Sequence, residues 1–475
     1  MKKILVLSPP RKDGVVMVKE GRCIQQKDAW SYVTAPITMV LIGTLLNESG
    51  FEAKVIDAGV DINDFDKLLI ETKKFKPDII VINTSTITIE DDMYTATFLK
   101  EKFSENIVTV LYGIHVSVLY KDVLKSGNKI DFCVIGEPEF TIKELVAAID
   151  KKSDINNVSG LAFLSDSGEI IKTQERNFIK NVDELPIPDW SLVNTDNYRL
   201  PLTNEKFLLV NTSRGCPYRC AFCNAYVYYG RKYRHHSVEY VIKELKQNIN
   251  KFKVKNFMMW AEEFILDKKF VQDLAQAIID EKLDIKWVCN SRVDAVDEKT
   301  LKMIRRAGCW NVAFGIESGV QEILDKIKKD TTLEQIKNAI NLTKKAGLST
   351  TGHVIIGFPY DTVETMKETA RFIRKLPLDF VQYYCATPYP GTELYEMAKK
   401  EAWINTDDWK KWAFNYSVLD YPHLKSNVIM HYRAKFFREY YFKPKIVLNT
   451  LKKHVKSPKN LITFAKNIKN FLKWM

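Results

Sequence analysis

Short runs of β-branched and aromatic residues alternate with amphipathic segments in two successive series along this chain of 475 residues. This rhythm predicts parallel sheets covered by helices. In the first series, over residues 1–150, we expect strands at residues 4–7, 54–57, 79–83, 108–112 and 132–135, with helices such as 38–47 and 64–74. The first segment therefore predicts a doubly wound, Rossmann-like α/β domain.

A connector over residues 151–200 separates the two series. It holds a possible hairpin, in which residues 160–163 return through 170–172, and a stretch whose two prolines favour an extended path. From residue 201 to about 400 we expect six strands, at 207–211, 256–259, 285–290, 311–316, 349–356 and 380–383, with helices such as 238–251 and 333–346. Six strands alternating with helices predict a full or partial β/α barrel, whose active site lies at the carboxyl ends of the strands.

Polar and glycine-bearing loops follow four strands of the first series. Ligands of doubly wound sheets bind beyond the carboxyl ends of the strands, so the loops at Ser8, Thr84, Gly113 and Gly136 are candidate ligand contacts. Ordinary turn chemistry is the alternative interpretation of these loops.

The formal net charge of +12 is concentrated near the C-terminus. Residues 431–475 hold twelve Lys or Arg and one acidic residue, Glu439, so the rest of the chain is nearly neutral. With 46% hydrophobic and 27% charged residues, the composition is that of a soluble folded protein. No apolar run approaches the roughly 20 residues of a membrane span, and we expect a cytoplasmic protein.

Three of the eight cysteines are clustered directly after the first strand of the second series. Cys216, Cys220 and Cys223 have the spacing C-x3-C-x2-C, and three thiolates so placed can hold one face of a 4Fe-4S cluster. One iron is then left for a substrate or cosubstrate. The alternative is a zinc site completed by His235 or His236, although this is not a usual zinc spacing.

The cysteine motif, with Phe222 before its last cysteine, resembles that of the radical S-adenosylmethionine (SAM) superfamily. Further segments over about residues 1–400 match, in the expected order, the branch that carries an N-terminal cobalamin-binding domain. These segments are Gly113-x-His115-x-Ser117, Gly136-Glu137-Pro138-Glu139-x-Thr141, Leu185-Pro-x-Pro188-Asp189-Trp190, Gly315-Ile-Glu317-Ser318-Gly319, Ile356-Gly357-Phe-Pro359 and Pro388-Tyr-Pro390-Gly391-Thr392.

The resemblance implies that SAM binds the open iron and is split by one electron to a 5′-deoxyadenosyl radical, which removes hydrogen from an unactivated carbon. It places Phe222 near the adenine and Glu262, beside Glu263, at the SAM amino group. It places Ser291 and Arg292 at the carboxylate and Glu317 at the ribose hydroxyls. A structural ion pair is the alternative role of Arg292 and of Glu317.

The resemblance also implies cobalamin between the two domains, in contact with the loops at Ser8, Thr84, Gly113 and Gly136, together with His115 and Glu137. The pattern Asp-x-His-x-x-Gly, which supplies a cobalt ligand in some cobalamin proteins, is absent. We therefore expect no histidine ligand to cobalt, and capping of a turn is the alternative role of His115. An N-terminal fold that has lost cobalamin altogether is the alternative to a cobalamin site.

The function implied is methylation of an unactivated carbon, with an external electron donor such as flavodoxin or ferredoxin. Within the family, the alternative is a ring-forming or ring-contracting oxidoreductase or mutase that uses cobalamin without methyl transfer. From another class, the alternative is a non-catalytic iron-sulfur or corrinoid-binding protein. A methylthiotransferase is disfavoured because the N-terminal domain offers only Cys23 and Cys133 for a second cluster.

The basic extension over residues 401–475 is expected to be helical, and its aromatic residues could cover the open end of the barrel. After Pro458, apolar residues follow helical spacing with lysines on another face. Such a helix can lie on an anionic bilayer, and a solvated face over a core stripe is the alternative. No RNA-binding module accompanies the charge, so nucleic acid is not an expected partner. The extension favours a lipid or membrane-associated substrate, with a secondary-metabolite precursor next.

Overall fold

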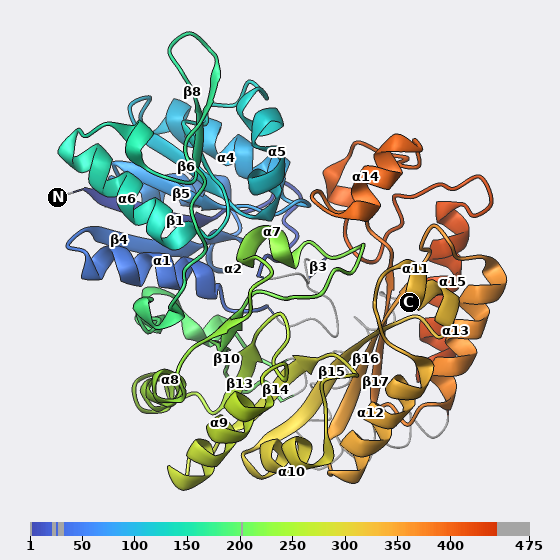
Figure 1. Cartoon of the computed structure of the whole chain (residues 1–475). Coiled ribbons are helices and arrows are strands. Elements are labelled where there is room, and N and C mark those ends of the chain that lie inside the picture. The colour runs from blue at the N-terminus through green and yellow to red at the C-terminus, as the bar shows by residue number, and fades with distance from the viewer. Residues whose placement is uncertain (1, 21–24, 27–32, 201–202, 444–475) are drawn as a thin grey trace.

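The computed structural model describes residues 2–20, 25–26, 33–200 and 203–443 (Figure 1). Its N-terminal part is a seven-stranded sheet in the order β4-β1-β5-β6-β7-β8-β9. The first five strands are parallel: β4 (Glu52–Asp57), β1 (Lys3–Ser8), β5 (Ile79–Asn83), β6 (Val108–Tyr112) and β7 (Phe132–Val134). The order reverses between β1 and β5, which confirms the doubly wound α/β prediction.

Helices cover both faces of this sheet because successive side chains of each strand point to opposite faces. Ile4 and Val6 pack in one hydrophobic cluster with α1 (Ile37–Glu48) and α6 (Pro138–Lys151). Leu5 and Leu7 pack in another, with α3 (Phe65–Phe75), α4 (Ile89–Lys102) and α5 (Ile114–Leu124). Both faces are thus buried, as the continuous apolar runs of the strands predict.

The hairpin expected in the connector extends this first sheet. It consists of β8 (Leu161–Leu164) and β9 (Ile170–Lys172), and β8 pairs antiparallel with β7. The N-terminal sheet therefore runs to Lys172, past the boundary expected near residue 150. The remaining connector has only short 3-10 turns, one of them at the buried Trp190.

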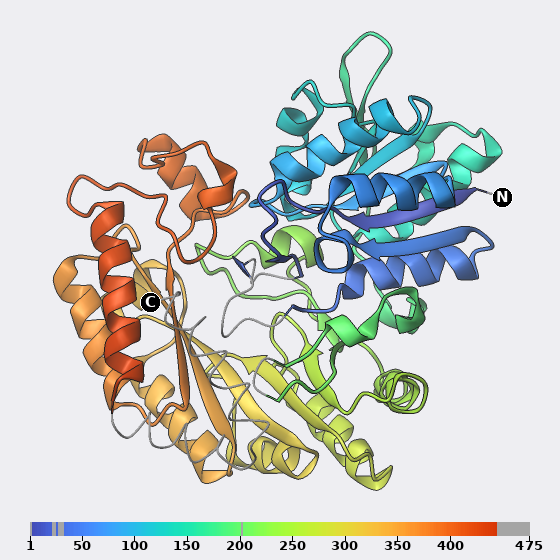
Figure 2. The ribbon, with the colours of Figure 1, turned by 180° about the vertical axis from the view of Figure 1, so that it is seen from behind.

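A second sheet of six parallel strands forms an open barrel (Figure 2). The strands are β10 (Phe207–Asn211), β13 (Asn256–Trp260), β14 (Lys286–Ser291), β15 (Cys309–Glu317), β16 (Ser349–Ile356) and β17 (Phe380–Cys385). The outer helices are α8 (Val238–Phe252), α9 (Lys268–Asp280), α10 (Glu298–Arg306), α12 (Leu333–Lys345) and α13 (Val363–Lys375). Since β10 and β17 are the two edges of the sheet, the barrel is partial.

Shorter elements complete the two parts. They are β2 (Met17–Val18), β3 (Gln25–Gln26), α2 (Ala58–Asp61), β11 (Ser213–Arg214), β12 (Arg234–His235), α7 (Ala225–Tyr229), α11 (Gln321–Lys326) and α14 (Glu393–Lys400). The ribbon of β11 and β12 and the helix α7 matter most for function, because they flank the cysteine motif.

The C-terminal extension is helical only in part. Residues 401–425 contain a single 3-10 turn, Trp409–Lys411, so the prediction of helix from residue 401 is wrong for this stretch. Its aromatic residues explain the difference, because Trp412 is buried against Ile87 and Tyr395 and holds the chain in an irregular path. The helix α15 (Ser426–Tyr441) then packs along β17 and α13.

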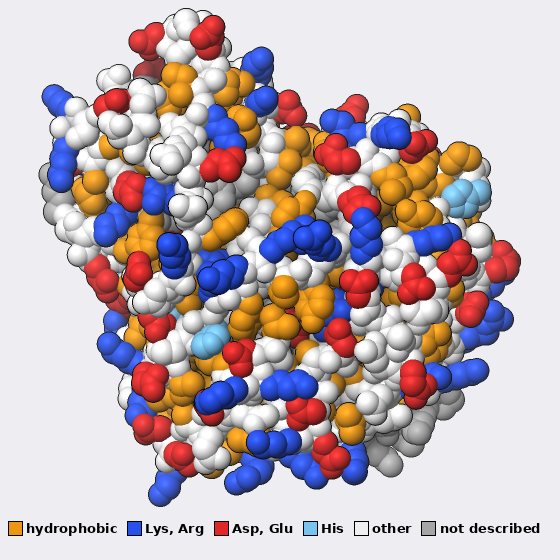
Figure 3. Space-filling view, viewed as in Figure 1, with side chains coloured by type: hydrophobic (Ala, Val, Ile, Leu, Met, Phe, Trp, Pro, Cys, Tyr) orange, Lys and Arg blue, Asp and Glu red, His pale blue; other side chains and the backbone are white. Residues whose placement is uncertain are grey.

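Acidic and basic side chains are interspersed on the face of the molecule shown in Figure 3. Within the described ranges, no helix has both the length and the apolar character that crossing a membrane requires. The lysine-rich segment after Pro458 lies outside the described residues.

Candidate active site

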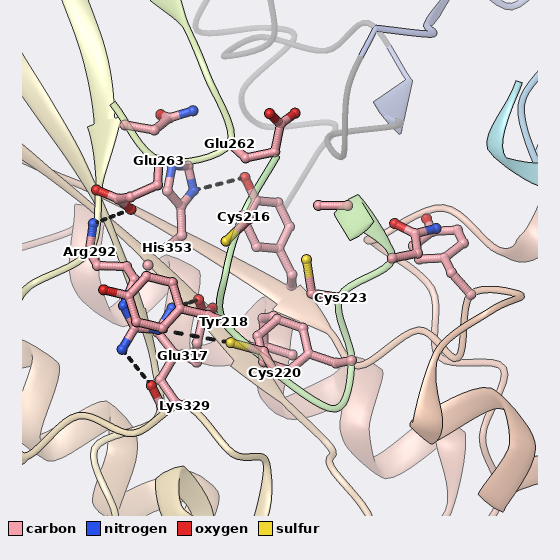
Figure 4. Close-up of a pocket in the computed structure, with 18 of the residues that line it drawn as sticks. Cys216, Tyr218, Cys220, Cys223, Glu262, Glu263, Arg292, Glu317, Lys329 and His353 are labelled. Atoms are coloured by element: carbon pink, nitrogen blue, oxygen red, sulfur yellow. Dashed lines mark hydrogen bonds and ion pairs between the residues drawn. The ribbon is translucent and has the colours of Figure 1, made fainter. Parts of the chain in front are cut away.

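A cavity lies at the carboxyl ends of the barrel strands, and all three motif cysteines line it (Figure 4). Cys216, Cys220 and Cys223 stand on the loop between β11 and α7, which follows the first barrel strand. The same cavity is lined by Phe222, Glu262, Ser291, Arg292 and Glu317, the residues predicted for SAM. The fold therefore brings together segments that are up to about a hundred residues apart in sequence.

The zinc alternative finds no support in this geometry. His235 stacks on Phe270, and His236 bonds Asp183 through Nδ1 at 2.9 Å, so neither histidine joins the cysteines. Over the part of the chain that the structure describes, no three His, Cys, Asp or Glu side chains are grouped as ligands of one metal ion. Three separate thiols on one cavity wall suit a multi-iron cluster better than a single ion.

Glu263 connects the second and third barrel strands. Its carboxylate accepts hydrogen bonds from the Ser291 hydroxyl at 2.9 Å and from the Arg292 backbone N–H at 2.7 Å. Burial raises the pKa of Glu263 to about 7. Glu262, beside it, accepts from the Gly215 N–H at 3.2 Å and so contacts the base of the cysteine loop.

Arg292 is held by a local ion pair. Its guanidinium bonds Asp294 through Nε at 2.9 Å and Nη2 at 3.0 Å, and it lies 3.6 Å from the Tyr218 ring centroid. Its Nη1 is 3.9 Å from the Cys220 sulfur. The structural ion pair considered as an alternative is thus present, although Arg292 still faces the cavity.

Glu317 is also ion-paired, with Lys329 at 2.8 Å between Oε1 and Nζ. A register shift in β15 near Ile316 and a left-handed backbone at Glu317 (φ 62°) turn this side chain into the cavity. A Cβ at Gly315 would lie 2.5 Å from Glu317 Oε1, so a larger residue there would displace the Glu317–Lys329 pair. Lys329 was not predicted from the sequence, because it follows the short helix α11 and belongs to no recognisable pattern.

Two more cavity features were not predicted. Phe222 packs on Phe358 at 5.4 Å between ring centroids, which builds an apolar wall. His353 stacks with Tyr384, and its Nδ1 is 3.2 Å from the Tyr384 hydroxyl. Because side chains alternate along a strand, the predicted strand over residues 349–356 places His353 on one face with Thr351 and Ile355, and this could have pointed to His353.

A second cavity, which we call the interdomain cavity, lies between the N-terminal sheet and the barrel. Of the six residues predicted to contact cobalamin, Thr84 and Gly113 line it, together with Lys19 and Glu20. A Cβ at Gly113 (φ 140°) would lie 2.3 Å from the Thr84 carbonyl oxygen, which explains the glycine. Ala225 and Glu262 line both cavities, so the two sites share a wall.

The other four predicted contacts lie outside that wall in the described structure. Ser8 pairs with Asp57 at the end of β1, and the Gly136 N–H donates to Ser117 at 3.1 Å. His115 is buried against Trp409, with 4.9 Å between ring centroids, and its Nδ1 is 3.4 Å from Thr86 Oγ1. Burial lowers the pKa of His115 to about 3. His115 therefore contacts Trp409 of the C-terminal extension.

Glu137 lies in an ion cluster with Glu139, Arg214 and Arg234, which we call the interdomain ion cluster. Arg214 bonds Glu139 at 2.6 Å and Glu137 at 3.3 Å, while Arg234 bonds Glu137 at 3.0 Å. All four residues are buried. Glu137 thus contacts the barrel domain instead of the wall of the second cavity.

Comparisons with known proteins agree with both halves of this architecture. The radical SAM superfamily model matches residues 210–373, and the B12 binding domain model matches residues 30–146. An uncharacterized methyltransferase of Pyrococcus horikoshii is 34% identical over 452 residues, which cover 95% of each chain. The chain belongs to the cobalamin-binding radical SAM family.

Two further similarities place this radical SAM enzyme among its relatives. The anaerobic magnesium-protoporphyrin IX monomethyl ester cyclase of Rubrivivax gelatinosus is 30% identical over 85% of this chain and 74% of its own. The solved structure of the radical SAM methyltransferase TsrM from Kitasatospora setae has a TM-score of 0.70, with 18% identity over 94% of this chain and 86% of its own. The latter likeness shows the shared fold.

The family assigns this enzyme three cofactors: a 4Fe-4S cluster, SAM and cobalamin. The residues present fit them. Three thiols stand on one wall of the barrel cavity, and polar side chains with an ion-paired Glu317 face them. The cavity between the domains is lined by the loop residues Thr84 and Gly113 and by the rings of Tyr228 and Tyr229, polar and aromatic groups that suit the edge and the face of a corrin ring.

Proposed function

We propose that this radical SAM enzyme methylates an unactivated carbon of a lipid or secondary-metabolite precursor. When bound, the cluster and SAM supply a 5′-deoxyadenosyl radical and cobalamin supplies a methyl carrier. The observation that carries the proposal is the shared wall of the two cavities. Ala225 and Glu262 line both, so a substrate in the barrel cavity would lie next to the interdomain cavity.

The chain's own groups suit binding and orientation. Cys216, Cys220 and Cys223 would hold the cluster, and Arg292 stands beside Cys220 where a carboxylate could exchange for Asp294. The Glu317–Lys329 pair offers both an acceptor and a donor to hydroxyl groups. Phe222 and Phe358 would cover an aromatic ring.

Residues of the C-terminal extension would exclude water from the reaction. Phe414 lines the barrel cavity and packs on Tyr384 and Tyr389 at 5.2 and 5.4 Å between ring centroids. Its carbonyl accepts a hydrogen bond from the Cys385 N–H at 2.8 Å, which fixes the segment over the end of β17. An enclosed cavity protects a reactive radical from side reactions.

The second candidate is an oxidative cyclase or mutase that uses the same cofactors without methyl transfer. The similarity to the Rubrivivax cyclase favours it, since that relative covers most of this chain. The name of the Pyrococcus relative, at higher identity and nearly full coverage, favours methyl transfer instead.

Isotope-labelled SAM separates the two candidates. The reconstituted enzyme, a flavodoxin or ferredoxin as electron donor and an extract of a strain lacking the gene would be incubated with SAM that carries a deuterated methyl group. Methyl transfer predicts a product that contains the label and is absent with the Cys220→Ala variant. A product altered without label, formed together with 5′-deoxyadenosine, would replace the proposal with the cyclase or mutase.

A further inference from the structure

The loop that carries the three cysteines is attached to the N-terminal domain at both of its ends. Arg214, two residues before Cys216, bonds Glu137 and Glu139, which begin α6 of the N-terminal domain. After Cys223 the chain enters α7, which packs against α5 of the same domain. The loop therefore belongs to the barrel by sequence and is held by the N-terminal domain through contacts.

The attachment before the cysteines is ionic and fully buried. Arg214 has no exposed surface and Glu139 has none, and Glu137 is 4% exposed. Two carboxylates face two guanidiniums, so the charges balance. Arg234, which pairs with Arg214 across the β11–β12 ribbon, bonds both oxygens of Glu137 at 3.0 and 3.1 Å.

Neighbouring contacts extend this attachment to both cavities. The Arg214 guanidinium lies 4.9 Å from the Tyr229 ring centroid, and Tyr229 lines the interdomain cavity. The next residue, Gly215, donates its N–H to Glu262, which lines both cavities. A path of direct contacts thus joins the interdomain cavity to the backbone of the cysteine loop.

The interdomain ion cluster is better suited to fixing the arrangement of the two domains than to adding stability. Replacing a buried ion pair by apolar residues is often neutral or stabilising, whereas removing one partner is costly. Such a cluster fixes one arrangement, because a shifted interface would leave buried charges unpaired. Its location fixes the position of the cysteine loop relative to the N-terminal sheet.

We propose that the interdomain ion cluster couples cobalamin binding to the geometry of the cysteine loop, with Glu139 and Arg214 as positioning residues. This inference rests on the proposed function in that cobalamin occupies the interdomain cavity. Cobalamin in the interdomain cavity would contact Tyr229 and so hold Tyr229 and Arg214 against the N-terminal domain. The loop would then be ordered before it takes up iron.

The test measures cysteine reactivity in the full-length protein free of cluster and cobalamin. Alkylation of Cys216, Cys220 and Cys223 by iodoacetamide would be followed by mass spectrometry, with and without saturating hydroxocobalamin. Coupling of ordinary size predicts that hydroxocobalamin slows alkylation at least about five-fold in the wild type. In the Glu139→Gln variant, saturating hydroxocobalamin should still bind but should slow alkylation less than about two-fold.

The matched control is Glu144→Gln, because Glu144 stands on the same helix α6 in an ion pair with Arg176 near the surface. It should keep the wild-type slowing. Arg214→Lys retains the charge but loses the forked contact with two carboxylates, and should give an intermediate effect. Arg214→Lys also replaces Glu139→Gln as the test variant if circular dichroism shows that Glu139→Gln does not fold.

Two results would overturn the inference. Equal slowing in the wild type, Glu139→Gln and Arg214→Lys would mean that cobalamin shields the cysteines directly. No slowing in the wild type, with hydroxocobalamin bound, would mean that the two sites are uncoupled. Absence of hydroxocobalamin binding to the wild type is a different outcome, since it would contradict the proposed function itself.

Discussion

At the scale of single residues, two buried carboxylates of the barrel cavity are held in place by hydrogen bonds or by an ion pair. Glu263 is held by Ser291 and by the Arg292 backbone, and Glu317 is paired with Lys329. His115 differs, because burial lowers its pKa to about 3 and it packs on Trp409 of the extension. It therefore acts as a neutral aromatic contact.

His115 should make stability fall in mild acid. The unfolded chain binds a proton below its ordinary pKa of 6.5, while the folded chain does so only near about 3. The stabilisation is full above 6.5 and is lost as the pH falls, by about 1.4 kcal/mol per pH unit at most. Urea unfolding at about pH 7.5 and 5.5 should show roughly 1.4 kcal/mol more loss for the wild type than for His115→Phe.

The exposed His431 on α15 supplies the control for this measurement. His431→Phe should keep the wild-type dependence on pH. The interpretation of His115 fails if His115→Phe and the wild type lose the same free energy of unfolding. Retention of hydroxocobalamin binding by His115→Phe would agree with the absence of a histidine ligand to cobalt.

At the scale of elements, the sequence predicts strands well where they are short apolar runs bounded by turns. The ranges 79–83, 108–112, 207–211 and 349–356 agree with β5, β6, β10 and β16 to the residue. The pairing of β8 with β7 is a long-range choice that no local pattern contains. The irregular path of residues 401–425 likewise depends on where Trp412 is buried.

The same limit applies to the site. The cysteine spacing and the ordered motifs identify the cluster loop and the charged part of the cavity wall. The Glu137–Arg214 and Glu317–Lys329 pairs need a three-dimensional arrangement, because their members come from different elements. The sequence therefore predicts which residues line the barrel cavity better than it predicts which of them touch.

The edge strand β17 should be stabilised by Tyr441 of α15. The Tyr441 hydroxyl accepts from the Val381 N–H at 3.0 Å and donates to the Val381 carbonyl at 2.9 Å. Tyr441→Phe leaves two buried backbone groups without this partner, so it should lower the free energy of unfolding by about 1–3 kcal/mol. Urea denaturation measures this loss, and Tyr416→Phe, at a side chain 44% exposed, should cost little. Equal stability of the two variants would contradict this role of α15.

At the scale of the whole molecule, the net charge of +12 separates into a body and a tail. Residues 444–475 contain eight lysines and no acidic residue, whereas α15 before them packs on the barrel. A test of the tail should therefore remove residues 444–475 and keep α15.

We propose peripheral contact of this tail with anionic membranes. Each lysine near such a surface contributes on the order of 1 kcal/mol, so the intact chain should sediment with phosphatidylserine vesicles at low salt and the truncated chain should not. Neutral phosphatidylcholine vesicles serve as the control. Equal sedimentation of both chains would remove the membrane proposal and leave the catalytic proposal unchanged.

Both domains take part in the proposed function, in which three cysteines hold a cluster used to cleave SAM in a cavity beside the cobalamin site. The most direct measurement is iron content and 5′-deoxyadenosine release by the anaerobically reconstituted, reduced protein. We expect about four irons per chain and release of 5′-deoxyadenosine, both abolished in Cys220→Ala. A colourless wild-type protein that retains zinc and leaves SAM intact would contradict it.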